Sequence, residues 1–234
     1  DGRKEVNDNI RKRVDGSGCY DVILPKFKKL VEKRGDKEYY VRGTFTKHNL
    51  DFSEDVFSLY NEGFDQISVE PVVCEPEAPY ALTEKELSAI FSEYERLSAR
   101  IPENNFFHFM LDLDQGPCAI KRLRGCGCGN EYVAITPDGD IYPCHQFVGL
   151  EEYKMGNLDE GTFNLDMKAE FAESHVYTKP ECKKCWAKFY CSGGCNYIYA
   201  GDIHNAHKFS CQLEKKRLEC AIMMKAARLE QNAD

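Results

Sequence analysis

The first hundred residues alternate between stretches with the apolar period of a helix and short runs rich in β-branched and aromatic residues. In the first stretch, residues 20–34, apolar side chains recur at helical spacing before Gly35, a typical C-cap: Val22, Ile23, Phe27, Leu30 and Val31. The same reasoning predicts the remaining elements, which are helices over 53–63 and after Thr83, and strands over 39–45 and 66–73. Because helices and strands alternate, we expect parallel strands joined by helical crossovers, hence an α/β fold.

Two details support the prediction of a helix after Thr83. Thr83 and Glu86 have the spacing of a capping box. The residues after them repeat an apolar face that we expect to be buried: Leu87, Ile90, Phe91, Tyr94 and Leu97.

From about residue 116 the periodicity weakens, and glycine and cysteine become frequent. One hairpin is still predicted, because residues 132–135 and 140–142 flank the turn signal Pro137-Asp138-Gly139. This hairpin would bring Cys128 and Cys144 to the same end. Residues 212–229 are again helical in pattern, with four apolar positions expected to pack: Leu213, Leu218, Ile222 and Leu229.

Charge and composition exclude several classes of function. The chain has 234 residues and a formal charge of −8, so it lacks the basic footprint of a nucleic-acid-binding protein. No apolar run approaches the roughly 18 residues that span a membrane. Many thiols without an apolar segment at the start, which reads DGRKEVNDNIRKR, lead us to expect the cytoplasm.

The cysteines form one spaced pattern. The pattern begins at Cys128, continues after ten residues with Gly139 and after four more with Cys144. A C-x2-C-x5-C-x3-C motif follows over residues 182–195, and Cys211 ends the pattern. Thiolates at such spacings bind metals, and they exceed what one four-coordinate site can use, so two centres are the natural interpretation. A disulfide framework is disfavoured, since disulfide-dense chains are usually small and secreted. Structural zinc is a stronger rival, but only one C-x2-C pair is present.

This pattern resembles the SPASM extension of radical S-adenosylmethionine (SAM) enzymes over about residues 118–215. The start of the chain resembles the later part of the radical SAM barrel, with Asp1-Gly2, Arg13 and the turn Gly16-Ser17-Gly18. The resemblance implies that residues 1–104 form the C-terminal part of a partial (β/α) barrel. Residues 105–234 are then a Cys-rich SPASM domain with a β-hairpin, short helices and a C-terminal helix.

Several stretches are similar to the maturases of SCIFF peptides: YYVRGTFTKHNLDFSEDV, FDQISVEPVV and GCGCGNEYVAITPDGDIYPCHQFVG. That similarity implies an enzyme that joins a cysteine to a threonine by a thioether in a small Cys-rich ribosomal peptide. The deoxyadenosyl radical takes a hydrogen from the threonine α-carbon, sulfur joins that carbon, and the extra electron leaves through a cluster. An electron donor such as ferredoxin or flavodoxin is then a partner.

The catalytic C-x3-C-x2-C triplet of radical SAM enzymes is not found in this sequence, where Cys19 and Cys74 stand alone. We therefore expect the C-terminal part of a longer enzyme, inactive alone, whose full length binds SAM and a third [4Fe-4S] cluster. Other SPASM maturases, such as an anaerobic sulfatase-maturing enzyme, and a non-catalytic zinc-binding module are the alternatives.

The resemblance also assigns ligands to two auxiliary [4Fe-4S] clusters. Cys128, Cys144 and Cys195 are implied for the first cluster. Its fourth ligand is Cys126, Cys118 or a substrate thiolate. The second cluster has a complete set: Cys182, Cys185, Cys191 and Cys211.

Three further residues have two interpretations each. Arg42 either meets the SAM carboxylate or is a paired structural arginine. Glu70, in an apolar strand, either contributes to SAM binding or is paired. At the position of His145, sulfatase-maturing relatives carry an aspartate that acts as the catalytic base. His145 is either a catalytic base itself or a surface histidine. The aromatic residues between the later cysteines, Trp186, Phe189 and Tyr190, are expected to shield the second cluster.

Overall fold

The structure is a computed structural model that describes residues 1–234 except 76, 103–104, 112, 114–122, 201–205 and 232–234. It contains two compact units, Asp1–Leu111 with Lys216–Asp234, and Asp112–Lys215, called the first and second units below. The sequence division at residue 104 assigned the whole C-terminal helix to the later part, whereas the last nineteen residues group with the first unit. The division into domains stays a prediction.

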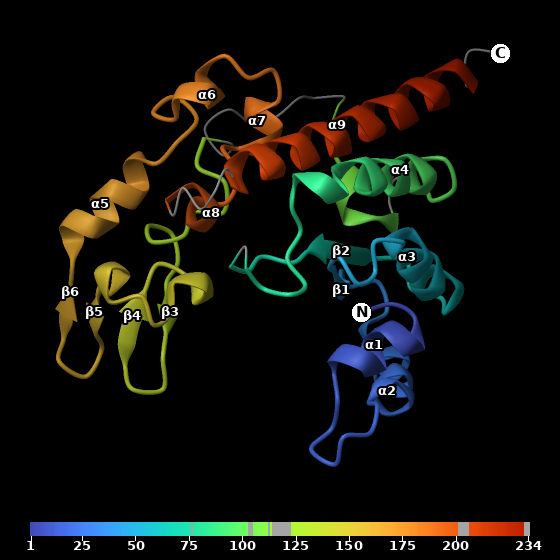
Figure 1. Cartoon of the computed structure of the whole chain (residues 1–234), viewed down its shortest axis with the longest axis horizontal. Helices are drawn as coiled ribbons and strands as arrows, with labels where there is room; N and C mark the ends of the chain where they lie inside the picture. The colour runs from blue at the N-terminus through green and yellow to red at the C-terminus, as the bar shows by residue number, and fades with distance from the viewer. Residues whose placement is uncertain (76, 103–104, 112, 114–122, 201–205, 232–234) are drawn as a thin grey trace. The chain divides into compact units, whose positions relative to one another are not determined.

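The first unit is built of helices around a small parallel sheet (Figure 1). Strands β1 (Val41–Phe45) and β2 (Ile67–Pro71) pair in parallel, with Arg42 opposite Ser68, and a single parallel bridge joins Ile67 to Phe106. The helices are α1 (Lys4–Ile10), α2 (Tyr20–Arg34), α3 (Phe52–Asn61) and α4 (Leu87–Ser98). The predicted alternation and the parallel pairing are confirmed. The barrel itself stays a prediction, because two strands do not define one.

The core of the first unit lies between the sheet and helices α3 and α4. Phe45 stacks on Phe52 with ring centroids 4.1 Å apart, and Tyr94 packs edge-on against Phe52. Of the five residues predicted to be buried in α4, only Phe91 is partly exposed. The capping box of Thr83 and Glu86 is present, at the start of a 3-10 turn, Glu84–Glu86, that leads into α4.

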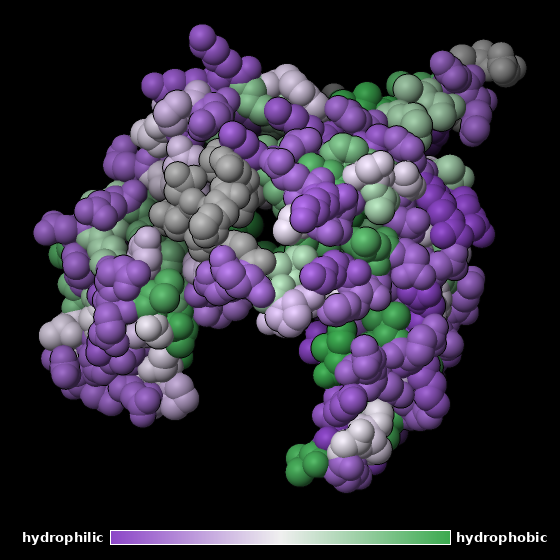
Figure 2. Space-filling view, viewed as in Figure 1, coloured by the Kyte–Doolittle hydropathy of each residue, from purple (hydrophilic) through white to green (hydrophobic). Residues whose placement is uncertain are grey.

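Helix α2 has the predicted bounds but buries none of its residues. Val22, Phe27 and Leu30 are each more than 40 % exposed, so its apolar face is uncovered in the first unit. Elsewhere the visible face is largely hydrophilic with scattered apolar side chains (Figure 2). None of the helices in the described ranges is long and apolar enough to cross a membrane.

The second unit contains an antiparallel sheet in the order β3-β4-β5-β6. Its strands are β3 (Ala134–Ile135), β4 (Asp140–Tyr142), β5 (Gly156–Asn157) and β6 (Thr162–Phe163). The predicted hairpin is confirmed, with Ile135 opposite Ile141 and Gly139 at φ 81° in the turn. The sequence did not predict β5 and β6, because two-residue strands carry no detectable alternation.

Short helices follow the sheet: α5 (Leu165–Glu173), α6 (Pro180–Lys183), α7 (Lys188–Cys191) and α8 (Asn196–Ala200). Helix α9 (Ala206–Gln231) begins in the second unit and continues in the first, where it lies beside α4 (Figure 1). Leu213 and Leu218 of α9 are buried as predicted, but Ile222 and Leu229 are 45 % and 57 % exposed. The expectation that all four pack was wrong, since the far part of α9 extends past the residues that could cover it.

Candidate metal centres

The hairpin places Cys128 beside Cys144. The backbone N–H of Gly129 lies 3.0 Å from the carbonyl oxygens of both Tyr132 and Pro143, so the chain after Cys128 is fastened to the chain before Cys144. Both cysteines are buried, with 2 % and 5 % of their surface exposed. The predicted meeting of these two residues is therefore seen in the second unit.

Cys126 joins this pair. The thiol of Cys128 is hydrogen-bonded to those of Cys126 and Cys144, which lowers the pKa of Cys126 to about 5 and that of Cys144 to about 6. The same two contacts raise the pKa of Cys128. Cys126 itself is exposed, and the Tyr132 hydroxyl lies 3.7 Å from its sulfur. Thiolates are the metal-binding form of cysteine, so the lowered pKa values of Cys126 and Cys144 are compatible with a metal-binding role.

We assign Cys195 to the same group from the electrostatic influence of its neighbours. The four thiols, called the first set, are Cys126, Cys128, Cys144 and Cys195. Burial raises the pKa of Cys195, the N–H groups of Ile198 and Tyr197 favour its thiolate, and Cys126 and Cys144 act on it as neighbouring negative charges. Cys118, the other candidate for the fourth position, lies outside the described residues.

The predicted ligands of the second cluster share one cavity. It measures about 500 Å³, and its lining includes all four, called the second set: Cys182, Cys185, Cys191 and Cys211. They come from α6, the segment after it, the end of α7 and the first part of α9. In the described part of the chain no three His, Cys, Asp or Glu side chains lie close enough to hold a single ion, and the four thiols form part of the wall of this cavity.

The chemistry of the second set suits an iron–sulfur cluster. Burial, followed by the charges of Glu214 and Cys211, raises the pKa of Cys191 to about 12, and burial also raises the pKa values of Cys182 and Cys211. A bound cation would favour the thiolate form of these three cysteines, as it does for metal ligands. An all-sulfur donor set around a cavity is the arrangement that iron–sulfur clusters use.

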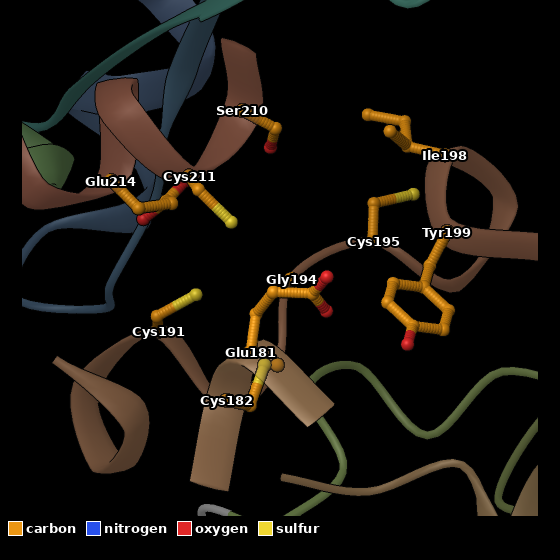
Figure 3. A pocket seen from close by; sticks show the side chains of 11 residues that line it. Glu181, Cys182, Cys191, Gly194, Cys195, Ile198, Tyr199, Ser210, Cys211 and Glu214 are labelled. Carbon is orange, nitrogen blue, oxygen red and sulfur yellow. The ribbon is translucent and has the colours of Figure 1, made fainter. Parts of the chain in front are cut away.

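A left-handed segment separates the two sets. Ser192, Gly193 and Gly194 have φ values of 58°, 85° and 71°, a run that is tolerated only because two of the three residues are glycine. In Figure 3 the thiols of Cys191 and Cys211 point toward one another, whereas that of Cys195 turns away. Cys195 nonetheless lines the small cavity drawn there together with Cys182, Cys191 and Cys211, so its membership of the first set stays a prediction.

Glu70 lies within a polar network of the first unit. Its Oε2 is 2.8 Å from Nε2 of His108 and 3.8 Å from a guanidinium nitrogen of Arg217, while the Ser68 hydroxyl donates to Oε1 at 2.7 Å. Burial opposes ionisation of Glu70, but the hydrogen bond and charge of His108, with Arg217, hold its pKa well below the usual range. The paired interpretation of Glu70 therefore has structural support, and its role in SAM binding stays a prediction.

Arg42 and His145 are both exposed. Arg42 makes no hydrogen bond or ion pair with the described residues, which gives no support to its being a paired structural arginine. His145 begins the 3-10 turn His145–Phe147 next to Cys144, and its charge is a minor factor in the lowered pKa of that thiol. Their catalytic and SAM-binding roles stay predictions.

The aromatic shield is smaller than expected. Trp186 lines the cavity of the second set but is 54 % exposed, while Phe189 packs edge-on against Tyr177 and does not line the cavity. Sequence reasoning missed Lys179 and Asn196, two buried polar residues between the sets. Their only sequence signal is their place beside the cysteine motifs.

Residues 126–186 match the SPASM family, an iron–sulfur cluster-binding domain. The cysteine-type anaerobic sulfatase-maturating enzyme of Clostridium novyi (strain NT) is 26 % identical over 211 residues, which cover 83 % of this chain and 55 % of that protein. That of Clostridium perfringens (strain 13 / Type A) is 37 % identical over 85 residues, covering 32 % and 22 %. The chain thus spans about half the length of the first of these relatives.

Solved structures share the fold. The chain matches "Native anSMEcpe with bound AdoMet" with a TM-score of 0.68 and 19 % identity, over 100 % of this chain and 68 % of that one. The complex of native anSMEcpe with AdoMet and the Kp18Cys peptide matches with the same score and identity, over 99 % and 68 %. The chain therefore carries a SPASM iron–sulfur cluster-binding domain and is homologous to anaerobic sulfatase-maturating radical SAM enzymes.

Proposed function

We propose that this chain is the auxiliary-cluster part of a radical SAM maturase that modifies a peptide. The observation that carries the proposal is the arrangement of eight cysteines of the second unit in two sets, one of which lines a common cavity. Two [4Fe-4S] clusters would use all eight thiols. SAM and a third [4Fe-4S] cluster belong to the remainder of the enzyme in this proposal.

The chain's own residues hold and tune the clusters. Cys128 and Cys144 are buried and anchored by the hairpin, so they form a rigid side of the first site. Asn196 directs its amide toward Cys128, and the N–H groups of Gln146 and Phe147 favour the Cys144 thiolate. When bound, such clusters supply a route for electrons into and out of the site. Donors aimed at the ligand sulfurs adjust the potential of that route.

Cys126 is the ligand that we propose to be displaceable. It is the exposed member of the first set, while Cys128 and Cys144 are buried. Only one glycine separates Cys126 from Cys128, and their thiols are hydrogen-bonded to one another. Both thiols can therefore approach the same site. If a peptide thiolate replaced Cys126, the buried residues Cys128 and Cys144 would still hold the cluster from the opposite side.

For the substrate we propose a small Cys-rich precursor peptide of the SCIFF kind, in which the enzyme joins cysteine to threonine by a thioether. The support is the similarity of three stretches to SCIFF maturases, together with the exposed position of Cys126. Ferredoxin or flavodoxin is the proposed electron donor, and the cytoplasm is the proposed location.

Maturation of a sulfatase is the second candidate, and the homology to sulfatase-maturating enzymes favours it. Against it, His145 stands where those relatives, by resemblance, carry an aspartate as base. A solvent-exposed histidine beside Cys144 would have to replace that carboxylate. A non-catalytic zinc-binding module is the third alternative, and the size of the cavity that the second set lines, about 500 Å³, favours a cluster over one ion.

Two experiments separate these functions. Iron and acid-labile sulfide in anaerobically prepared protein support the enzyme, whereas zinc alone supports the module. Co-expression of the full-length enzyme with a Cys-rich peptide, followed by mass spectrometry, then identifies the reaction. Loss of two hydrogens, with fragmentation that maps the link to cysteine and threonine, supports the thioether. Formylglycine in a sulfatase-derived peptide, with the Cys-rich peptide unchanged, refutes it.

A further inference from the structure

Lys179 carries a buried ammonium group in the second unit. Its surface is 2 % exposed, although lysine is almost never fully buried without a partner. Its Nζ donates to the carbonyl oxygen of Gly193 at 3.0 Å and to Oδ1 of Asn196 at 2.9 Å. The ammonium also lies 4.5 Å from the centre of the Tyr199 ring. All of these acceptors are neutral.

The surroundings of Lys179 lack a carboxylate partner within the described residues. A charge buried without a counter-ion is costly, and burial accordingly lowers the pKa of this ammonium. The groups that favour its charged form are sulfur atoms. Two belong to the second set and two to the first: Cys182, Cys191, Cys195 and Cys128.

The hydrogen bonds of Lys179 join it to two residues that lie beside cysteines of both sets. Lys179 directly precedes α6, which carries Cys182. Gly193, its first acceptor, lies in the left-handed segment between Cys191 and Cys195. Asn196, its second acceptor, turns its amide nitrogen to the sulfur of Cys128 at 3.7 Å. The lysine is therefore held where the two sets come closest in the chain.

We propose that Lys179 is a counter-charge shared by the two cluster sites, and that it raises the reduction potential of both. The proposal rests on the two-cluster function above. A cubane held by thiolates carries net negative charge, and reduction adds another. A fixed positive charge in a buried, poorly screened place stabilises the more negative form. Because Lys179 acts on members of both sets, removing its charge affects both sites together.

A purely structural role would give a different result. If Lys179 only fastens the carbonyl of Gly193, its replacement weakens folding or cluster assembly but leaves the potentials of assembled clusters unchanged. The potential is therefore the deciding measurement, since it is made on protein whose iron content matches the wild type.

The main test compares Lys179→Met with Lys184→Met in anaerobically prepared protein. Lys184 lines the cavity of the second set but is exposed, so its charge is screened by water. Redox titration followed by electron paramagnetic resonance gives the potential of each site, with Cys144→Ala and Cys182→Ala assigning the signals. We expect Lys179→Met to lower the reduced-to-oxidised ratio at fixed ambient potential at least about threefold at both sites. Lys184→Met should leave both ratios near the wild type.

A second variant covers the case in which Lys179→Met does not assemble. Asn196→Asp keeps the oxygen that accepts from Lys179 but gives the ammonium a carboxylate partner, and Asn196 is hydrogen-bonded to no cysteine of the second set in the described structure. The potential of the second site should fall in this variant as well. Unchanged potentials, or a shift at one site alone, overturn the shared role. A wild-type protein with a single reducible cluster instead overturns the two-cluster function itself.

Discussion

Replacing Glu70 by glutamine tests whether this residue is structural. In the wild type the carboxylate accepts from Ser68 at 2.7 Å, meets His108 at 2.8 Å and faces Arg217 at 3.8 Å. The side chain of His108 is 2 % exposed and that of Glu70 is 23 % exposed. Glutamine has nearly the same shape, so Glu70→Gln removes the charge and one acceptor while leaving the packing of β2 intact.

The expected cost follows from this burial. Breaking a buried ion pair on one side costs about 3–5 kcal/mol, because the partner is left uncompensated. Since Glu70 is partly exposed and the amide oxygen still accepts one hydrogen bond, we expect about 2–3 kcal/mol for Glu70→Gln. A free-energy change of about 1.4 kcal/mol is tenfold in an equilibrium, so this corresponds to about 30- to 150-fold faster exchange of the best-protected amides.

Hydrogen exchange read by mass spectrometry is the suitable assay, because peptides from β2 and α4 report on the first unit alone. Glu38→Gln is the matched control, since Glu38 is exposed and its side chain has no partner in the described structure. Tyr94→Phe should give a smaller loss, because it removes only the hydroxyl that bonds His108 and Arg217. If Glu70→Gln exchanges like the wild type while SAM binding weakens, the structural reasoning is refuted and the SAM-binding interpretation is supported.

Three further predictions concern the clusters. Anaerobically reconstituted protein should hold about eight irons per chain, and iron near four with all cysteines intact would contradict two cubanes. Cys191→Ala should lose the second cluster and reduce soluble protein, because binding by an all-protein ligand set is coupled to folding; unchanged iron and solubility would count against the assignment. Cys128→Ala should lose the first cluster while Cys126→Ala keeps it, as read by iron content and electron paramagnetic resonance with and without peptide; the opposite outcome reverses the two roles.

Sequence patterns predicted well those elements whose formation depends on residues close together in the chain. The helix from Tyr20 to Arg34, the capping box at Thr83 and the hairpin turn at Gly139 all formed as predicted. Each depends on residues within a few positions of one another, so backbone geometry and nearby hydrogen bonds decide it. Burial was predicted less well. Leu229 and the apolar face of α2 are exposed, since periodicity says which face is apolar but not whether another element covers it.

The candidate site divides in the same way. The resemblance to the SPASM extension assigned the second set, and its four thiols line one cavity. Short spacings hold Cys182, Cys185 and Cys191 near one another, whereas Cys211 follows twenty residues after Cys191, so its place depends on the tertiary structure. Spacing could not choose the fourth member of the first set. The contacts of Cys126 with Cys128 and Tyr132, and the exposure of Cys126, are properties of the folded hairpin region.

What the sequence determined by itself was a spaced cysteine pattern that indicates thiol chemistry, on an α/β frame with a hairpin beside it. The tertiary structure alone decided which polar groups share their surroundings. Lys179 lies among cysteines up to 51 positions earlier in the chain, and Glu70 meets His108 and Arg217 from distant segments. Burial and electrostatic partners arise from contacts between remote parts of a chain. A linear pattern cannot encode those contacts, although they set the charge that each site holds.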